Sequence, residues 1–123
     1  MNKDLTDEQK RVLFESGTEP AFSGDLLHEE RNGTFTCANC GSELFASDTK
    51  FDSGSGWPSF TEPKNLEHVK LTDDSSMGIV RTEVTCANCG GHLGHVFPDG
   101  PADKGGQRYC INSLSLQFDP NEK

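Results

Sequence analysis

Cysteines carry the most specific chemical signal in this sequence of 123 residues, because four of the five form two identical tetrapeptides. CANC occurs at 37–40 and again at 86–89, each time after a threonine and before a glycine. Two C-x-x-C pairs are typical of a zinc site with four thiolates, since the two-residue spacer lets both sulfurs face one ion. We therefore predict one structural Zn²⁺ bound by Cys37, Cys40, Cys86 and Cys89.

The surroundings of the two pairs fit this interpretation better than a redox dithiol. A thioredoxin-like C-x-x-C needs a βαβ setting with a helix that starts at the motif, whereas the flanks here are rich in strand-forming residues. The glycine after each second cysteine, Gly41 or Gly90, permits the positive φ of a tight turn. Because sulfur fills all four positions, we expect the metal site to be structural, with any catalysis located elsewhere.

The fifth cysteine, Cys110 in RYCIN, has no such partner. In a strand, Arg108, Cys110 and Asn112 would share one face. A free cysteine most often packs as a small hydrophobic residue in the core. However, a guanidinium beside the sulfur would raise the thiolate fraction, as a nucleophile requires. Both interpretations remain open on this stretch alone.

Two further segments hold candidates for chemistry. HLGHVFPDGP places His92 and His95 three residues apart; they are either solvated or hydrogen-bonded loop histidines, or proton donors for a thiolate, since histidine titrates near neutral pH. SGSGWPSF contains the only tryptophan, Trp57. It is either a core residue or an indole displayed by a rigid loop at a pocket.

Composition restricts the class of protein. A formal charge of −9 disfavours binding to nucleic acid or to an anionic membrane surface, and no apolar run is long enough to span a bilayer. The N-terminus lacks the apolar core of a secretory signal, so we expect a cytoplasmic protein with reduced cysteines. The length suits a single domain, 1–123, and nothing in the sequence demands more than a monomer.

The elements that must hold these residues are mostly strands. Thr6 and Gln9 form a capping box, which predicts a helix from there to Phe14; a second short helical piece around Leu26 and Leu27 is weakly indicated. After Gly33 the short runs rich in β-branched and aromatic residues predict strands: 34–37, 43–46, 68–71, 77–86 and 107–118. The predicted fold is mainly β, with two antiparallel sheets clasped by the zinc site and short N-terminal helices.

Taken together, these motifs resemble the B-type methionine sulfoxide reductases, which reduce the R epimer of methionine sulfoxide. The resemblance covers nearly the whole chain, from GTEPAFSG through FDSGSGWPSF and HLGHVFPDGP to RYCINSLSL. It implies that Cys110 is the nucleophile and that its thiolate attacks the sulfoxide sulfur. It also implies roles for other side chains in catalysis (Arg108, Asn112, His92, His95 and Asp99) and in binding the substrate (Trp57, against the methyl group, and Phe97).

In this interpretation His95, supported by His92, protonates the sulfoxide oxygen, and Asp99 orients one of the histidines. Methionine leaves and Cys110 becomes a sulfenic acid. Many relatives have a resolving cysteine where this chain has Ser55, so we expect thioredoxin or a small thiol to reduce the sulfenic acid directly. The expected substrates are oxidised proteins or peptides containing methionine-R-sulfoxide.

Two other classes compete with an enzyme. A non-catalytic zinc-binding module would keep the four paired cysteines but would have no use for Arg108, Cys110 and Asn112. A zinc ribbon that binds nucleic acid is disfavoured by the negative charge.

Overall fold

A short amphipathic helix opens the part of the chain described by the computed structural model, which covers residues 4–15, 17–29, 31–74 and 81–120. Helix α1 spans Asp7–Glu15 and buries Val12 and Leu13. The predicted capping box is confirmed: the Thr6 hydroxyl accepts from the Gln9 amide at 3.1 Å, and the Gln9 side chain accepts from the Thr6 amide at 2.9 Å. The second predicted helical piece is wrong, because Leu26 and Leu27 lie in turns.

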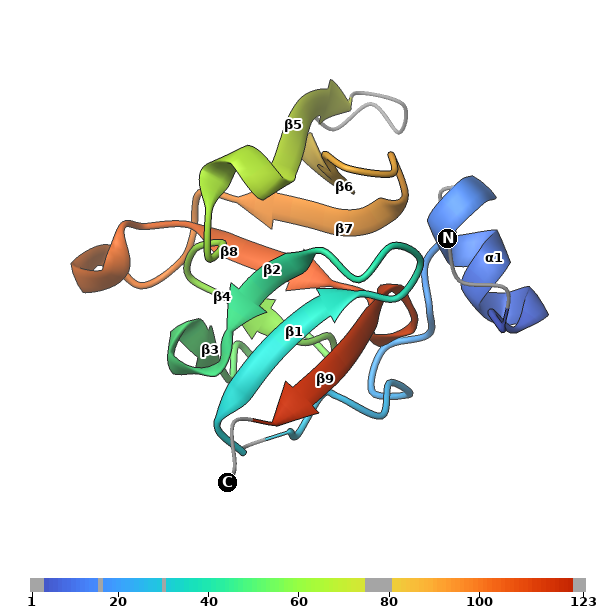
Figure 1. Cartoon of the computed structure of the whole chain (residues 1–123). Coiled ribbons are helices and arrows are strands. Elements are labelled where there is room, and N and C mark those ends of the chain that lie inside the picture. Colours follow the sequence, from blue (N-terminus) through green and yellow to red (C-terminus); the bar gives the residue numbers. More distant parts are fainter. Residues whose placement is uncertain (1–3, 16, 30, 75–80, 121–123) are drawn as a thin grey trace.

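Within the described residues, nine strands form two antiparallel sheets, which confirms the predicted fold class (Figure 1). The small sheet has the order β2-β1-β9, and the large sheet has the order β3-β4-β8-β7-β6-β5. Their bounds are β1 Gly33–Cys37, β2 Glu43–Ala46, β3 Lys50–Phe51, β4 Ser59–Phe60, β5 Val69–Asp74, β6 Arg81–Cys86, β7 His92–Phe97, β8 Arg108–Ile111 and β9 Leu116–Pro120. The start of the strand predicted at 77–86 lies outside the described residues.

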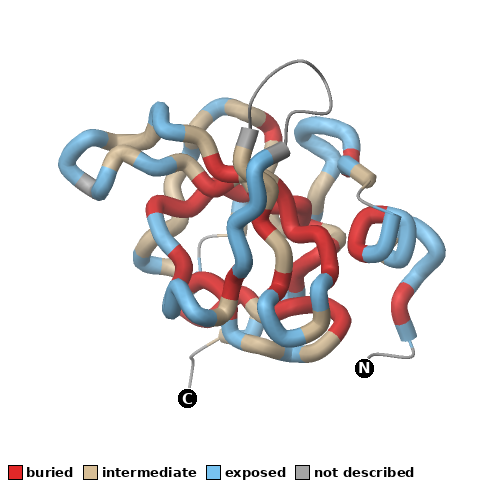
Figure 2. The backbone as a smooth tube through the Cα atoms, turned by 90° about the horizontal axis from the view of Figure 1, so that it is seen from above, coloured by how far each residue is buried: buried red, intermediate tan, exposed pale blue. Residues whose placement is uncertain are grey.

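Aromatic side chains join the two sheets. Phe60, Tyr109 and Val96 are paired across β4, β8 and β7, so they project from one face of the large sheet. Phe60 stacks on Phe45 of the small sheet at 4.4 Å between ring centroids and meets Phe35 edge-on at 5.0 Å. The buried segments accordingly gather in the middle of the molecule, with α1 at its edge (Figure 2). The opposite face of these three strands does not contribute to this aromatic core.

The segment predicted as one strand, 107–118, is two strands in different sheets. After β8 the chain turns at Asn112, whose amide donates to the Leu93 carbonyl at 2.9 Å, and β9 then joins the small sheet. The alternation of side chains therefore holds only as far as Ile111. A short 3₁₀ turn, Ser113–Ser115, makes the crossing. Further 3₁₀ turns span Ser47–Thr49, Leu66–His68 and Ala102–Lys104.

The histidine segment also differs from the loop interpretation, because His92–Phe97 is a central strand. Gly94 permits this, since a Cβ there would overlap the Cys110 carbonyl oxygen of β8. Within the described ranges, no helix has the length and apolar character needed to cross a membrane.

Candidate active site and metal centre

The two CANC segments form matching turns that meet at one end of the sheets. One connects β1 to β2 and the other connects β6 to β7, and in each the glycine after the second cysteine has a positive φ, 80° at Gly41 and 79° at Gly90. The four sulfur atoms lie within 4.8 Å of one another. Cys37 and Cys89 are 3.7 Å apart and Cys40 and Cys86 are 3.5 Å apart, close to the roughly 3.8 Å edge of a tetrahedron of zinc–thiolate bonds.

The chemistry of this set fits a cation. A hydrogen bond between Cys37 and Cys86 raises the pKa of the Cys37 thiol and lowers that of Cys86 to about 5, so without a counter-charge the pair favours sharing one proton. A divalent ion would relieve the repulsion between four thiolates. Because each sheet supplies two ligands, such an ion would join the small sheet to the large one. The four cysteines can thus hold a metal ion.

A separate row of side chains crosses the large sheet on the face away from the small sheet. Cys110 of β8 is paired with Ser59 of β4 on one side and with His95 of β7 on the other. His95 is in turn paired with Glu83 of β6. Directly paired residues project from the same face with Cβ atoms about 5 Å apart. The fifth cysteine therefore lies in a polar row and not in the aromatic core.

Arg108 is the cation beside this sulfur. Its Nη1 donates to the Cys110 Sγ at 2.8 Å, while Nε and Nη2 donate to the two oxygens of Asp99 at 2.8 and 3.1 Å. The guanidinium lies 4.6 Å from the centroid of the Phe97 ring, which is paired with it across β7 and β8. Hydrogen bonding to Asp99 raises the pKa of Arg108 above its usual value. Asp99 thus orients Arg108, whereas the sequence predicted that it orients a histidine.

Both predicted histidines lie on one face because β7 contains a bulge. Residues three apart in a regular strand point to opposite faces, but the pairing of β6 with β7 skips Leu93. The His92 and His95 rings are consequently 5.5 Å apart. His92 is buried and its Nδ1 donates to Glu83 at 2.7 Å, so the ring is held by a carboxylate that the sequence did not point to.

Trp57 and Asn112 are fixed through the backbone of Glu19. The indole Nε1 donates to the Glu19 carbonyl at 2.9 Å, and the Glu19 amide donates to Asn112 Oδ1 at 3.0 Å. Glu19 is only 1% exposed, and its carboxyl accepts from the Leu114 amide at 2.9 Å. Burial raises the pKa of this carboxyl, with a smaller contribution from Asp25. Glu19 therefore ties the loop 17–24 to the end of β8.

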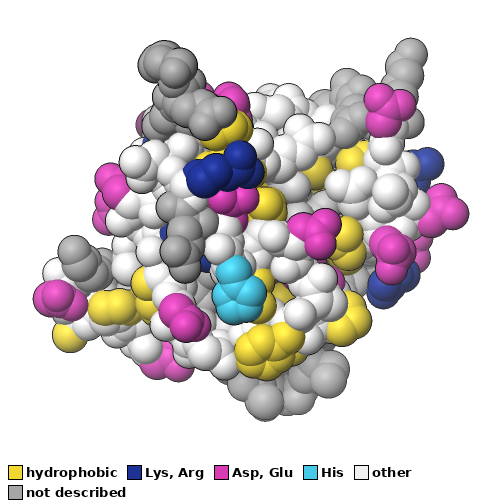
Figure 3. Space-filling model, turned by 90° about the horizontal axis from the view of Figure 1, so that it is seen from below, with side chains coloured by type: hydrophobic (Ala, Val, Ile, Leu, Met, Phe, Trp, Pro, Cys, Tyr) yellow, Lys and Arg dark blue, Asp and Glu magenta, His cyan; other side chains and the backbone are white. Residues whose placement is uncertain are grey.

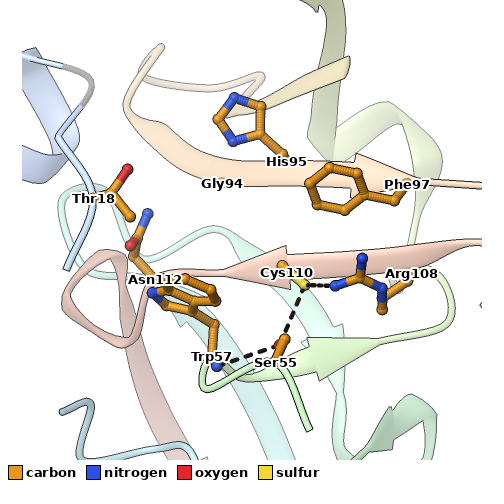
Figure 4. A pocket seen from close by; sticks show the side chains of 9 residues that line it. All are labelled: Thr18, Ser55, Trp57, Gly94, His95, Phe97, Arg108, Cys110 and Asn112. Atoms are coloured by element: carbon orange, nitrogen blue, oxygen red, sulfur yellow. Dashed lines mark hydrogen bonds between the residues drawn. The ribbon is translucent and has the colours of Figure 1, made fainter. Parts of the chain in front are cut away.

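These groups line one cavity of about 340 Å³ beside Cys110. Figure 4 shows the sulfur between Arg108 and the indole, with His95 and Ser55 on opposite sides of it. His92 is outside the lining and contacts it through His95. The lining comprises Thr18, Ser55, Trp57, Gly94, His95, Phe97, Arg108, Cys110 and Asn112.

Several residues of the site are not predicted by the sequence patterns. Glu83, Glu19 and Thr18 lie in segments whose patterns indicated only a strand or a turn. Ser53 and Ser59 lie on either side of Trp57 in SGSGWPSF, a segment whose glycines predicted a rigid loop but no role for its serines. Only the three-dimensional pairing brings them to Cys110.

The fold and the two sites define a class of protein: a β domain with a closed cluster of four cysteines and a separate cysteine that contacts Arg108 in a cavity. The comparisons agree. A family model described as SelR domain matches residues 5–120. A protein from Leifsonia xyli named peptide methionine sulfoxide reductase MsrB is 57% identical over 98% of this chain and 87% of its own length. A protein of the same name from Leptospira interrogans is 57% identical over 94% and 88%.

The chain belongs to the SelR domain family, which confirms the resemblance noted from the motifs. A more distant likeness is to the crystal structure of the Mis18 Yippee-like domain, with a TM-score of 0.59 and 18% identity over 76% of this chain and all of that chain. At this identity the likeness shows a shared fold alone.

Proposed function

We propose that this protein reduces methionine-R-sulfoxide in proteins or peptides to methionine, with Cys110 as the nucleophile. The observation that carries the proposal is the Arg108 Nη1 contact of 2.8 Å to the Cys110 sulfur, inside a cavity that also holds His95 and Trp57. A neighbouring guanidinium favours the thiolate, which is the reactive form of cysteine. The names of the close relatives agree with this activity.

The reaction transfers the sulfoxide oxygen to Cys110. The thiolate attacks the substrate sulfur and forms an S–S bond. The protonated oxygen then passes to the cysteine sulfur as the sulfoxide S–O bond and the new S–S bond break, which releases methionine and leaves Cys110 as a sulfenic acid. The substrate sulfur gains two electrons and the cysteine sulfur loses two. The departing oxygen needs one proton, and His95 is the proposed donor because it is paired directly with Cys110 across β7 and β8. His92, hydrogen-bonded to Glu83, is the proposed support for His95.

The proposed preference for the R epimer depends on the apolar wall of the cavity. Trp57 and Phe97 offer aromatic surface to the substrate methyl group, whereas Arg108 and His95 offer polar hydrogens to the oxygen. Fixing the methyl group and the oxygen at different walls selects one configuration at sulfur. Asn112, held by Glu19 and by the Leu93 carbonyl, is proposed to fix the rim near Trp57.

Recycling is proposed to use an external thiol. The hydroxyl at position 55 cannot form a disulfide, and the other four cysteines gather in the metal centre. One thiol would displace water from the sulfenic acid to give a mixed disulfide, and a second would release Cys110. We infer thioredoxin or a small thiol as the reductant, a monomer of one domain as the working form, and the cytoplasm as its location.

The metal is proposed to be one structural Zn²⁺ on Cys37, Cys40, Cys86 and Cys89. Four sulfur ligands leave no position for water, so the ion would hold the sheets together and take no part in catalysis. A nucleic acid partner is not proposed, since the acidic side chains are spread over the face in Figure 3 and the basic ones lie in separate groups.

Separated R and S epimers of a methionine sulfoxide peptide, with dithiothreitol as reductant, test the function. We expect turnover of the R epimer by the wild type and none by Cys110→Ser. His68→Gln, which alters a histidine bonded to the Glu43 carbonyl in another part of the chain, is the control and should keep full activity. Equal turnover of both epimers, or activity in Cys110→Ser, would contradict the proposal.

A further inference from the structure

Three serine hydroxyls form a connected group beside the Cys110 sulfur. Ser55 Oγ lies 3.6 Å and Ser59 Oγ lies 3.7 Å from Sγ. Ser53 Oγ joins the other two, at 2.8 Å from Ser55 Oγ and 2.7 Å from Ser59 Oγ. The steps of the reaction proposed above use none of these hydroxyls.

The three hydroxyl protons of this group have few hydrogen-bond acceptors. Ser53 donates to Ser55, so Ser55 already has a donor and its own proton can point at the sulfur. Ser59 can donate to Sγ, to Ser53, or to the Trp57 carbonyl at 3.1 Å. A thiolate only accepts hydrogen bonds. A charged Cys110 therefore orders the chain in one direction, from Ser59 through Ser53 and Ser55 to the sulfur.

Burial strengthens these hydrogen bonds. Ser59 is fully buried, and Ser53 and Ser55 are half-buried, so water competes weakly for the hydroxyls. Hydrogen bonds to an ionised group are stronger than those between neutral groups. Arg108 reaches the sulfur from another direction (Figure 4), and the side toward His95 remains for the sulfoxide.

We propose that Ser55 is a catalytic residue whose hydroxyl donates to Cys110 and holds it as a thiolate, and that Ser53 and Ser59 are positioning residues that aim the Ser55 proton at the sulfur. The inference rests on the proposed function and extends it to both half-reactions. In the first, the hydroxyls raise the thiolate fraction available for attack on the sulfoxide. In the second, Cys110 is the leaving group of the mixed disulfide, and a stabilised thiolate leaves faster. Ser55 cannot form a disulfide with Cys110, but its hydroxyl contributes a hydrogen bond to the Cys110 thiolate.

Alkylation of Cys110 with iodoacetamide over pH 5 to 10 tests the inference in the metal-loaded protein. The labelled tryptic peptide that begins at Tyr109 reports this cysteine separately from the other four. We expect Ser55→Ala to slow alkylation at pH 7 by ~3- to 10-fold and to shift the midpoint of the profile upward, with little change in the limiting rate at high pH. Ser53→Ala should shift the midpoint less. Adding Ser53→Ala to the Ser55→Ala variant should shift the midpoint less than Ser53→Ala does in the wild type.

Two controls complete the test. Ser47→Ala removes a hydroxyl that accepts from the Gly33 amide away from the cavity, and it should leave the profile unchanged. Ser55→Thr keeps the hydroxyl and should restore most of the wild-type midpoint. If Ser53→Ala and Ser55→Ala melt like the wild type and share its profile, the serines do not stabilise the thiolate. That result would leave the reductase proposal standing, because alkylation needs no sulfoxide.

Discussion

His95 and Cys110 occupy directly paired positions on the antiparallel strands β7 and β8, and both line the same cavity. The sheet thereby fixes the distance between the proposed proton donor and the Cys110 sulfur without any loop. Strand scaffolds hold such pairs more rigidly than loops do.

Replacing His95 by glutamine should lower kcat by ~10²- to 10⁴-fold, because the sulfoxide oxygen would leave without its proton donor. KM should change little, since the glutamine retains a polar group at the cavity wall. Steady-state kinetics on the R epimer measure both constants. A variant with nearly normal kcat would assign proton transfer to another group.

Replacing Asp99 by asparagine should lower kcat/KM about 2- to 5-fold at low salt, since Arg108 would lose a charged partner that orients it. The difference in kcat/KM between wild type and variant should become smaller with added salt, because Asp99 is exposed and salt screens its interaction with Arg108. Arg108 lowers the pKa of Asp99 from its ordinary value of 3.8. The pairing is therefore complete above pH 4 and is lost only as the pH falls through the lowered value. Rate profiles should show a constant ratio of wild type to variant from pH 5 to 9.

Replacing Glu19 by glutamine should flatten the pH dependence of stability. Burial raises the pKa of the Glu19 carboxyl above 4.5, so its contribution is fully present below that pH and is lost as the pH rises through the raised value. Glutamine keeps an acceptor for the Leu114 amide and carries no charge. In urea titrations from pH 4 to 8, the free energy of unfolding of the variant should rise relative to that of the wild type by about 1 kcal/mol or more. Glu19→Ala, which loses the acceptor, should be destabilised at every pH.

Replacing Ser55 by cysteine should convert recycling to an internal disulfide, because the Ser55 hydroxyl already lies 3.6 Å from the Cys110 sulfur. After one equivalent of substrate without reductant, the intact mass of the variant should fall by two hydrogen atoms. The wild type should instead give a dimedone adduct on Cys110. A dimedone adduct in Ser55→Cys, with no loss of mass, would show that the loop cannot bring the sulfurs together.

Replacing Cys86 by serine should release the metal and lower the free energy of unfolding by ~4 kcal/mol or more, because the clasp joins the two sheets. Metal content by atomic emission and urea unfolding measure the two effects. Cys110→Ser is the matched control and should retain one equivalent of zinc. Normal stability in the metal-free variant would mean that the sheets pack adequately without the clasp.

Much of this protein can be predicted from local patterns. The CANC spacing and the glycines at 41 and 90 indicated the metal turns, since ligand spacing and positive φ are properties of a few consecutive residues. The capping box of α1 is similarly local. Alternation within β8 placed Arg108 on the face of Cys110, and the contact between them is direct.

Other features depended on which strands became neighbours. Alternation failed at Asn112, because the chain leaves one sheet there to enter the other. His92 and His95 share a face only through the bulge that pairs β7 with β6, and Glu83 meets His92 for the same reason. No short window of sequence contains that register.

The sequence by itself determined the chemistry that is available: a four-thiolate clasp, one spare cysteine, and a serine in place of a second. The tertiary structure decided where that chemistry acts. Ser59 and His95 lie on either side of Cys110 because β4, β8 and β7 pair in this order. Hydrogen bonds between strands that are distant along the chain set this arrangement, and their free energy depends on the packing of the whole sheet rather than on any one segment.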